Sequence, residues 1–140
     1  MIDVQVSNAH PRRRARSRAV ATVVRSVLRA ERRSRASVSV VFIDSRRCRA
    51  LNRRYLAHDW VTDVISFPLA PEPVIEGEVY VNLDRARTQA DQLGLPYGNE
   101  VLRLVVHGVL HLLGYDDRTP FRRRRMQRRQ EDLVQRFRRV

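Results

Sequence analysis

Residues 107–117, HGVLHLLGYDD, hold the side chains of this chain best suited to bind a metal ion. His107 and His111 are four positions apart on an apolar run. On a helix, such a pair projects from one face with Cβ atoms about 6 Å apart. Two imidazole nitrogens, each about 2.0 Å from one ion, can span that separation, as they do in helical zinc sites. The spacing therefore indicates a candidate metal site.

A third ligand is available just beyond the apolar run. Gly114 permits the left-handed turn that ends a helix, so the chain can double back toward the two histidines. Asp116 or Asp117 can then offer a carboxylate to the same ion. Three protein ligands leave the fourth position of a tetrahedral ion open to water, which is the arrangement of a catalytic rather than a structural zinc.

Two other interpretations of this motif have to be weighed. A histidine on an apolar helix is often a hydrogen-bonded core residue, and an HxxxH spacing alone is weak support for a metal. A zinc protease would carry a glutamate directly after the first histidine as general base. Gly108 stands there and cannot act as one, so a protease is disfavoured.

The histidines lie within a predicted helix over residues 99–113 that is apolar around most of its circumference, as a buried helix is. Its polar side chains are Glu100, Arg103, His107 and His111. At about 100° per residue they fall within a stripe roughly 80° wide. We therefore expect a buried central helix with one polar edge.

Four strands are predicted from alternating or β-branched runs, at residues 2–7, 38–44, 63–67 and 78–83. We expect one helix to begin at Pro11, a second after a Ser45 cap, a third after Asn82 or Asp84, and a last one over residues 120–138. The short connector before the fourth strand favours antiparallel pairing of the last two strands, while the early crossovers favour parallel pairing. The prediction is a single α/β (or α+β) domain over residues 1–140, with a mixed four-stranded sheet flanked by helices.

The composition points to a polyanionic partner. All 28 basic residues are arginines, and with 15 acidic residues they give a formal net charge of +13. So basic a domain suggests nucleic acid, although a solubilising surface is the alternative; the arginines at 12–18 could serve either role. The single cysteine, Cys48, excludes an internal disulfide. With no signal peptide and no membrane span evident, we expect a cytoplasmic protein.

These motifs resemble the YbeY-type endoribonucleases, the bacterial rRNA maturation factors. HGVLHLLGYDD is similar to the family's HGxLHLxGYDH signature. LNRRYLAHDWVTDVISFP, at residues 51–68, is similar to LNxxYRxxDxxTDVLSFP, and EGEVYVN, at residues 76–82, fits the family's next strand. Met126 and Glu131 lie on the expected last helix, so the resemblance extends over about residues 38–135.

The resemblance implies a zinc-dependent endoribonuclease specific for single strands. It would act on small-subunit (16S) ribosomal RNA in maturation and ribosome quality control. The family's three metal ligands fall on His107, His111 and Asp117. RNA contacts are expected from Arg53, Arg54, His58 and Arg103. The alternative is an RNA- or ribosome-binding maturation factor with a mainly structural metal and weak or no catalysis.

Two positions depart from the family pattern. Asp117 replaces the usual histidine, so manganese or another harder divalent metal becomes more plausible beside zinc. Leu56 replaces an arginine that the family is thought to use near phosphate, and losing a positioned cation costs transition-state stabilisation. Thr62 and Asp63 match polar family positions, but turn and cap roles at a strand start are expected first. No general base is evident from the residues.

Overall fold

The computed structural model describes residues 1–57 and 59–137 of the chain. Within these ranges the secondary structure consists of nine elements. They are β1 (Ile2–Asn8), α1 (Ser17–Ala30), β2 (Ala36–Ile43), α2 (Ser45–Tyr55), β3 (Val64–Pro68), β4 (Glu76–Asn82), α3 (Leu83–Leu93), α4 (Tyr97–Leu112) and α5 (Pro120–Phe137). No helix in these ranges is both long enough and apolar enough to cross a membrane.

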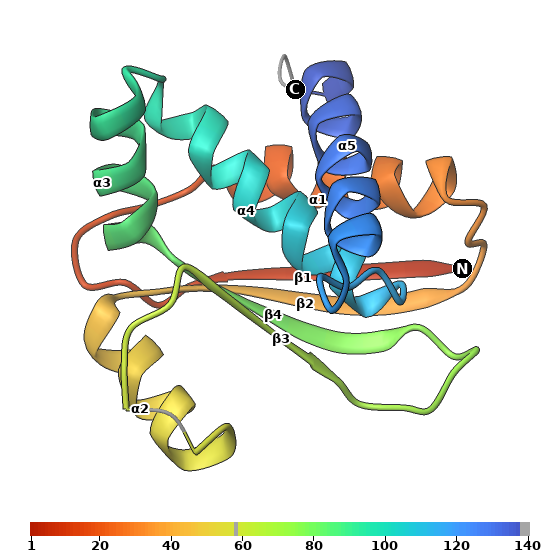
Figure 1. Cartoon of the computed structure of the whole chain (residues 1–140), viewed down its shortest axis with the longest axis horizontal. Coiled ribbons are helices and arrows are strands. Elements are labelled where there is room, and N and C mark those ends of the chain that lie inside the picture. Colours follow the sequence, from red (N-terminus) through yellow and green to blue (C-terminus); the bar gives the residue numbers. More distant parts are fainter. Residues whose placement is uncertain (58, 138–140) are drawn as a thin grey trace.

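The four strands form one sheet in the order β1-β2-β4-β3. β1 pairs with β2 and β2 with β4 in parallel, whereas β3 runs antiparallel to β4 at the edge. The predicted mixed α/β architecture is therefore confirmed. Figure 1 shows α1, α3, α4 and α5 on one face of the sheet and α2 on the other.

The main core lies between the sheet and α1, α4 and α5, and α4 is its central helix. Most of the α4 side chains are buried, among them Val105, Val106, Val109 and Leu110, each at 0% exposure. The predicted buried central helix is thus observed, and it carries both His107 and His111. A smaller cluster of Ile43, Cys48 and Ile65 packs on the α2 side of the sheet.

Two predicted helix starts were wrong. α1 begins at Ser17 rather than Pro11, because the buried ring of His10 holds the preceding loop: its Nδ1 accepts hydrogen bonds from the backbone N–H groups of Arg12 and Arg13 at 3.0 and 2.9 Å. α2 is capped by Asp44 rather than Ser45, since the Asp44 carboxylate accepts from the Arg47 N–H at 2.9 Å.

Asn82 caps α3, as one of the two predicted alternatives had it. Its Oδ1 accepts from the N–H groups of Asp84 and Arg85, and its Nδ2 donates to Ser45 Oγ and to the Thr62 carbonyl, both at 3.1 Å. One fully buried side chain therefore joins β4, α3, the start of α2 and the loop before β3. That loop borders the candidate site.

Gly108 is the point where α4 lies closest to the sheet. A Cβ atom at this position would overlap the Val79 side chain and come within 3.1 Å of Val64 Cγ2. Ser66 fixes the same contact by donating a hydrogen bond to the Gly108 carbonyl at 2.8 Å. The glycine between the two histidines therefore has a packing role, and it sets how close both rings come to β3.

Gly108→Ala is expected to lower the free energy of unfolding by about 1–3 kcal/mol, because the buried Val79 has no room to move aside. Urea denaturation measures this loss. Gly98→Ala is the matched control on the same helix, because a Cβ at Gly98 meets nothing within 4 Å. The control is expected to be neutral or slightly stabilising. Equal stability of the two variants would contradict the close approach at Gly108.

Candidate functional site

The three predicted metal ligands line one pocket of about 420 Å³. His107 and His111 come from the end of α4, and Asp117 comes from the segment that follows it. The opposite wall is built from the end of α2, the α2–β3 loop and β3. These wall residues are Asn52, Leu56, Trp60, Thr62, Asp63, Val64, Ile65 and Ser66. The fold thus brings together two stretches that are distant in the sequence, residues 52–66 and residues 107–117.

Gly114 turns the chain back toward this pocket, as predicted. Its φ of +98° lies in the region that glycine tolerates best, and the Tyr115 N–H then donates to the Leu110 carbonyl at 3.1 Å. This turn brings Asp117 to the same pocket as the two histidines.

The two imidazole rings lie close together in an edge-to-face arrangement. Their ring centroids are 5.5 Å apart with an interplanar angle of 63°. Within residues 1–57 and 59–137, no group of three histidine, cysteine, aspartate or glutamate side chains has the geometry of a metal site. The three predicted ligands therefore line the same pocket, but their coordination of one metal ion stays a prediction.

The tautomer of His107 follows from its partner on α5. His107 Nδ1 lies 2.7 Å from Gln130 Oε1, and Gln130 Nε2 donates to Glu131 Oε2 at 3.1 Å. Since the carboxylate takes the amide N–H, the amide oxygen must face His107 and accept from its Nδ1–H. The Nε2 lone pair of His107 is then left to bind an ion, which is how a ligating histidine is usually prepared.

His111 is held in the protonation state that a ligand needs. Partial burial of the ring at the pocket wall lowers the pKa of His111, and the nearby His107 and Arg118 lower it further, while Asp117 and Asp116 raise it. The net shift is downward, so the imidazole is neutral at neutral pH and its lone pair is available. Two imidazoles and one carboxylate fit a divalent metal by donor chemistry.

Of the two candidate aspartates, Asp117 is the better placed. The Asp116 carboxylate is engaged by the Arg118 N–H at 3.0 Å and by Arg122 Nη1 at 3.3 Å. Asp116 is absent from the described lining of the pocket, whereas Asp117 belongs to it. Asp116 therefore stabilises the turn after α4, whereas Asp117 lines the pocket.

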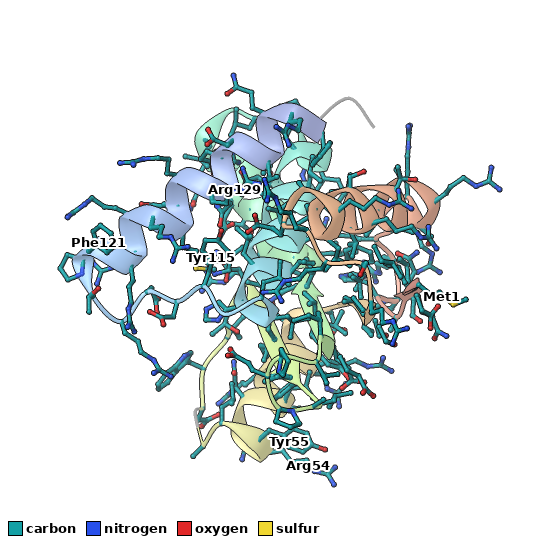
Figure 2. All side chains as sticks on the ribbon, turned by 90° about the vertical axis from the view of Figure 1, so that its right-hand side faces the viewer. Met1, Arg54, Tyr55, Tyr115, Phe121 and Arg129 are labelled. Carbon is teal, nitrogen blue, oxygen red and sulfur yellow. The ribbon has the colours of Figure 1, made fainter. Side chains whose placement is uncertain are left out.

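The expected RNA contacts on α2 lie outside the pocket wall. Arg53 Nε is 3.5 Å from Asp59 Oδ1, and the Arg54 guanidinium lies 5.3 Å from the centre of the Tyr55 ring. Figure 2 shows Arg54 and Tyr55 projecting from the end of α2. His58 lies outside the described residues. Neither Arg53 nor Arg54 belongs to the described lining of the pocket, and their contact with RNA stays a prediction.

Arg103 forms ion pairs with two neighbouring carboxylates. It pairs with the buried Glu100 and with Glu131, whose Oε1 is 2.9 Å from Arg103 Nη2. These contacts raise the pKa of Arg103 and lower that of Glu131. Arg103 lines a different surface pocket, and it is linked to His107 through Glu131 and Gln130; its contact with RNA stays a prediction.

Sequence reasoning missed Trp60 and Asn52 as pocket residues. Trp60 is 54% exposed at the pocket, and it is the only tryptophan of the chain. Asn52 is fully buried: its Nδ2 donates to the Trp60 carbonyl at 2.9 Å and to Thr62 Oγ1 at 3.2 Å, while its Oδ1 has no partner among the described residues. A lone tryptophan in a polar loop was the available signal for Trp60, and the signal for Asn52 was its match to the asparagine of the LNxxY motif.

Leu56 lies in the pocket wall and is 39% exposed. No arginine occurs among the described lining residues. Thr62 has the structural role expected of it, since its carbonyl and hydroxyl accept from Asn82 and Asn52. Asp63 accepts one hydrogen bond from Gln89 at 3.3 Å and is the second carboxylate in the described lining.

Comparisons with known proteins agree on one family. The sequence profile of the family described as endoribonuclease YbeY matches residues 3–138. The chain is 37% identical over 134 residues to the endoribonuclease YbeY of Chlorobium luteolum, covering 96% of this chain and 97% of that protein. It is 40% identical over 134 residues to the Anaeromyxobacter endoribonuclease YbeY, covering 94% of this chain and 70% of that one.

A solved structure shares the fold. The solution structure of TM1509 from Thermotoga maritima superposes with a TM-score of 0.67 at 24% identity. The superposition covers 96% of this chain and 88% of the other.

Proposed function

The chain belongs to the endoribonuclease YbeY family, and from this premise we propose that it is a metal-dependent endoribonuclease that cleaves single-stranded RNA. Its substrate in the cell is small-subunit (16S) ribosomal RNA, during cytoplasmic ribosome maturation and quality control. The observation that carries the proposal is the single pocket lined by His107, His111 and Asp117. Zinc is the proposed metal, and manganese is the alternative that the Asp117 carboxylate allows.

His107, His111 and Asp117 would hold the ion. A metal bound there supplies Lewis-acid stabilisation of the charge that develops on a phosphoryl oxygen. Gln130 fixes the His107 ring, and Asp63, in the opposite wall, is the candidate acceptor for the proton released when water attacks.

The arginines outside the pocket supply attraction to the RNA backbone. The exposed side chains of α5 include Arg122, Arg123, Arg124, Arg125 and Arg128. With a formal net charge of +13, binding is expected to weaken steeply with salt. Because Leu56 leaves the described pocket wall without a cation, these outer arginines hold the strand rather than the scissile phosphate.

The test is cleavage of a single-stranded RNA fragment by the purified protein before and after chelation. Cleavage is expected to disappear with the metal and to return when zinc or manganese is added back. If binding survives chelation, the melting temperature falls and no cleavage is seen at any stage, the alternative of a maturation factor with a structural metal is correct. Cleavage that is unchanged by chelation contradicts a metal-dependent enzyme.

Trp60 gives the site a surface for an unpaired base. Base–aromatic stacking contributes about 1–3 kcal/mol per base, so Trp60→Ala is expected to weaken binding of single-stranded RNA about tenfold. Trp60→Phe keeps a ring and is the matched control. Since the chain has one tryptophan, quenching of its fluorescence by RNA also reports on this side chain alone. Equal affinity of the Ala and Phe variants would exclude stacking here.

A further inference from the structure

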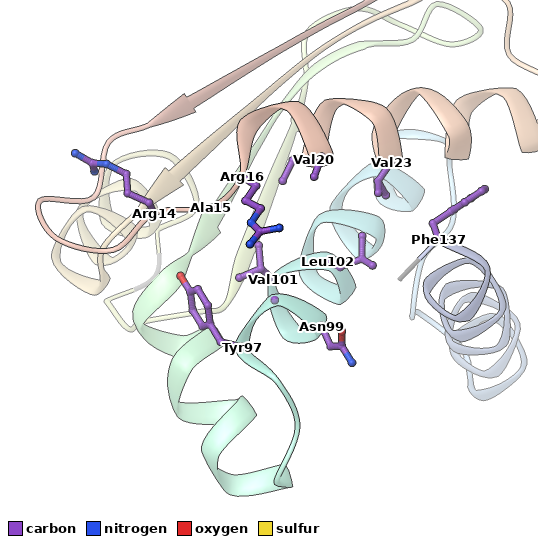
Figure 3. Close-up of a pocket in the computed structure, with 12 residues that line it drawn as sticks. Arg14, Ala15, Arg16, Val20, Val23, Tyr97, Asn99, Val101, Leu102 and Phe137 are labelled. Carbon is purple, nitrogen blue, oxygen red and sulfur yellow. The ribbon is translucent and has the colours of Figure 1, made fainter. Parts of the chain in front are cut away.

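A second pocket, of about 410 Å³, lies between the starts of α1 and α4. Its described lining shares no residue with the pocket of His107, His111 and Asp117. Figure 3 shows Arg14, Arg16 and Tyr97 toward one end, and Val23, Leu102 and Phe137 toward the other. The cavity is therefore polar and basic at one end and apolar at the other.

The basic end carries a cation without a counter-ion. Arg16 is exposed, and its guanidinium makes no ion pair or hydrogen bond with the described part of the chain. Arg14 stays close, with its Nη1 donating to the His10 carbonyl at 2.6 Å. These two belong to the arginine-rich segment 12–18, which the active-site pocket does not use.

Two helix starts meet at the same end. The caps of α1 and α4 are Arg16 and Pro96, and neither makes a side-chain capping hydrogen bond. The first turns of both helices line the pocket, through Ala19 on α1 and through Tyr97 and Gly98 on α4. Unpaired N–H groups and the positive end of the helix dipole favour an anion.

Tyr97 adds an unused hydrogen-bond donor. Its hydroxyl oxygen is buried and has no partner within the described ranges. Burial raises the pKa of Tyr97, so the hydroxyl keeps its proton and can donate. The ring is held from outside by Arg87, whose guanidinium carbon is 5.6 Å from the ring centroid. An unpaired hydroxyl and a free guanidinium that line the same pocket are features expected of an anion site.

The apolar end has room for a flat ring. Val20 and Val23 form a floor that is 7% and 2% exposed, with Leu102 and Phe137 beside it. A pocket of this volume lies in the range of small-molecule sites. A guanidinium fork and two helix starts suit the geometry of a phosphate better than that of a carboxylate.

We propose that this pocket binds a nucleotide, with its phosphate at Arg16, Tyr97 and the two helix starts and its base on the apolar floor. The nucleotide is either free or the 5′-phosphorylated end of an RNA strand. The site is separate from the pocket assigned to cleavage, so it can hold a strand end while another part of the strand is cut.

The test is titration of the full chain with adenosine 5′-monophosphate by calorimetry. The monophosphate is expected to bind at least about tenfold more tightly than adenosine or inorganic phosphate, since each makes only half of the contacts. Arg16→Gln and Tyr97→Phe are each expected to weaken its binding about tenfold. Arg18→Gln, an exposed arginine on the same helix outside the described lining, is the matched control and is expected to change it less than twofold.

A second arm identifies the source of the nucleotide. If a 5′-phosphorylated 2′-O-methyl oligonucleotide displaces the monophosphate and its 5′-hydroxyl counterpart does not, the site takes a strand end. If neither displaces it, the site takes the free nucleotide. The proposal is overturned if the monophosphate binds no better than inorganic phosphate. It is equally overturned if the Arg16 and Tyr97 variants bind as tightly as the Arg18 control.

Discussion

His111→Ala is expected to lower kcat/KM for RNA cleavage by at least about 100-fold, because it removes one of two imidazoles that would hold the ion stabilising the transition state. His111 is exposed at the end of α4, so the fold is expected to survive the change. Single-turnover cleavage of a single-stranded RNA, with the bound metal measured on the same sample, gives the result.

A neighbouring pair of aspartates provides the matched control for this prediction. Asp117→Asn, like His111→Ala, is expected to lose both the bound metal and the cleavage activity. Asp116→Asn is expected to retain both, since an amide oxygen can still accept from the Arg118 N–H. Loss in the Asp116 variant alone would exchange the roles of the two aspartates. Full activity in all three variants would contradict the assignment of the metal site.

Gln130→Leu is expected to weaken metal binding about 10–100-fold while leaving all three proposed ligands in place. The reason is the 2.7 Å contact between Gln130 Oε1 and His107 Nδ1, which sets the ring orientation and makes Nε2 the nitrogen available to the metal. Competition with a metal-binding dye measures the dissociation constant of the metal. The effect comes from positioning, so added metal should restore cleavage in this variant but not in His111→Ala.

The same substitution one turn earlier on α5 controls for helix effects. Gln127 is exposed and makes no contact with His107 among the described side chains, so Gln127→Leu is expected to bind metal as the unaltered chain does. Equal dissociation constants for the two variants would show that the Gln130 contact has no influence on the metal.

The parts of the fold that depend on local patterns could be predicted from the sequence. β-branched runs and alternation located all four strands, and the short connector before β4 predicted its antiparallel pairing with β3. The apolar circumference of α4 predicted its central place, and Gly114 predicted the left-handed turn. These features depend on residues close together in the chain, where spacing alone carries the information.

The features that sequence reasoning missed depend on partners distant in the chain. His10 lies 2.7 Å from Asp84, and this contact helps to hold the loop that delays the start of α1. The ion pair of Arg103 with Glu131 from another helix was likewise not anticipated, and its RNA contact stays a prediction. Gln130 and Asn52 were not anticipated, because their roles exist only once α5 packs on α4 and α2 packs beside β3.

The most direct test is a crystal of the protein soaked in zinc and measured at the zinc absorption edge. One anomalous peak is predicted at about 2.0–2.2 Å from a nitrogen of each of His107 and His111 and from an oxygen of Asp117. A crystal that shows no peak in this pocket, or a peak bound by other residues, would contradict the claim that these three side chains share a cation.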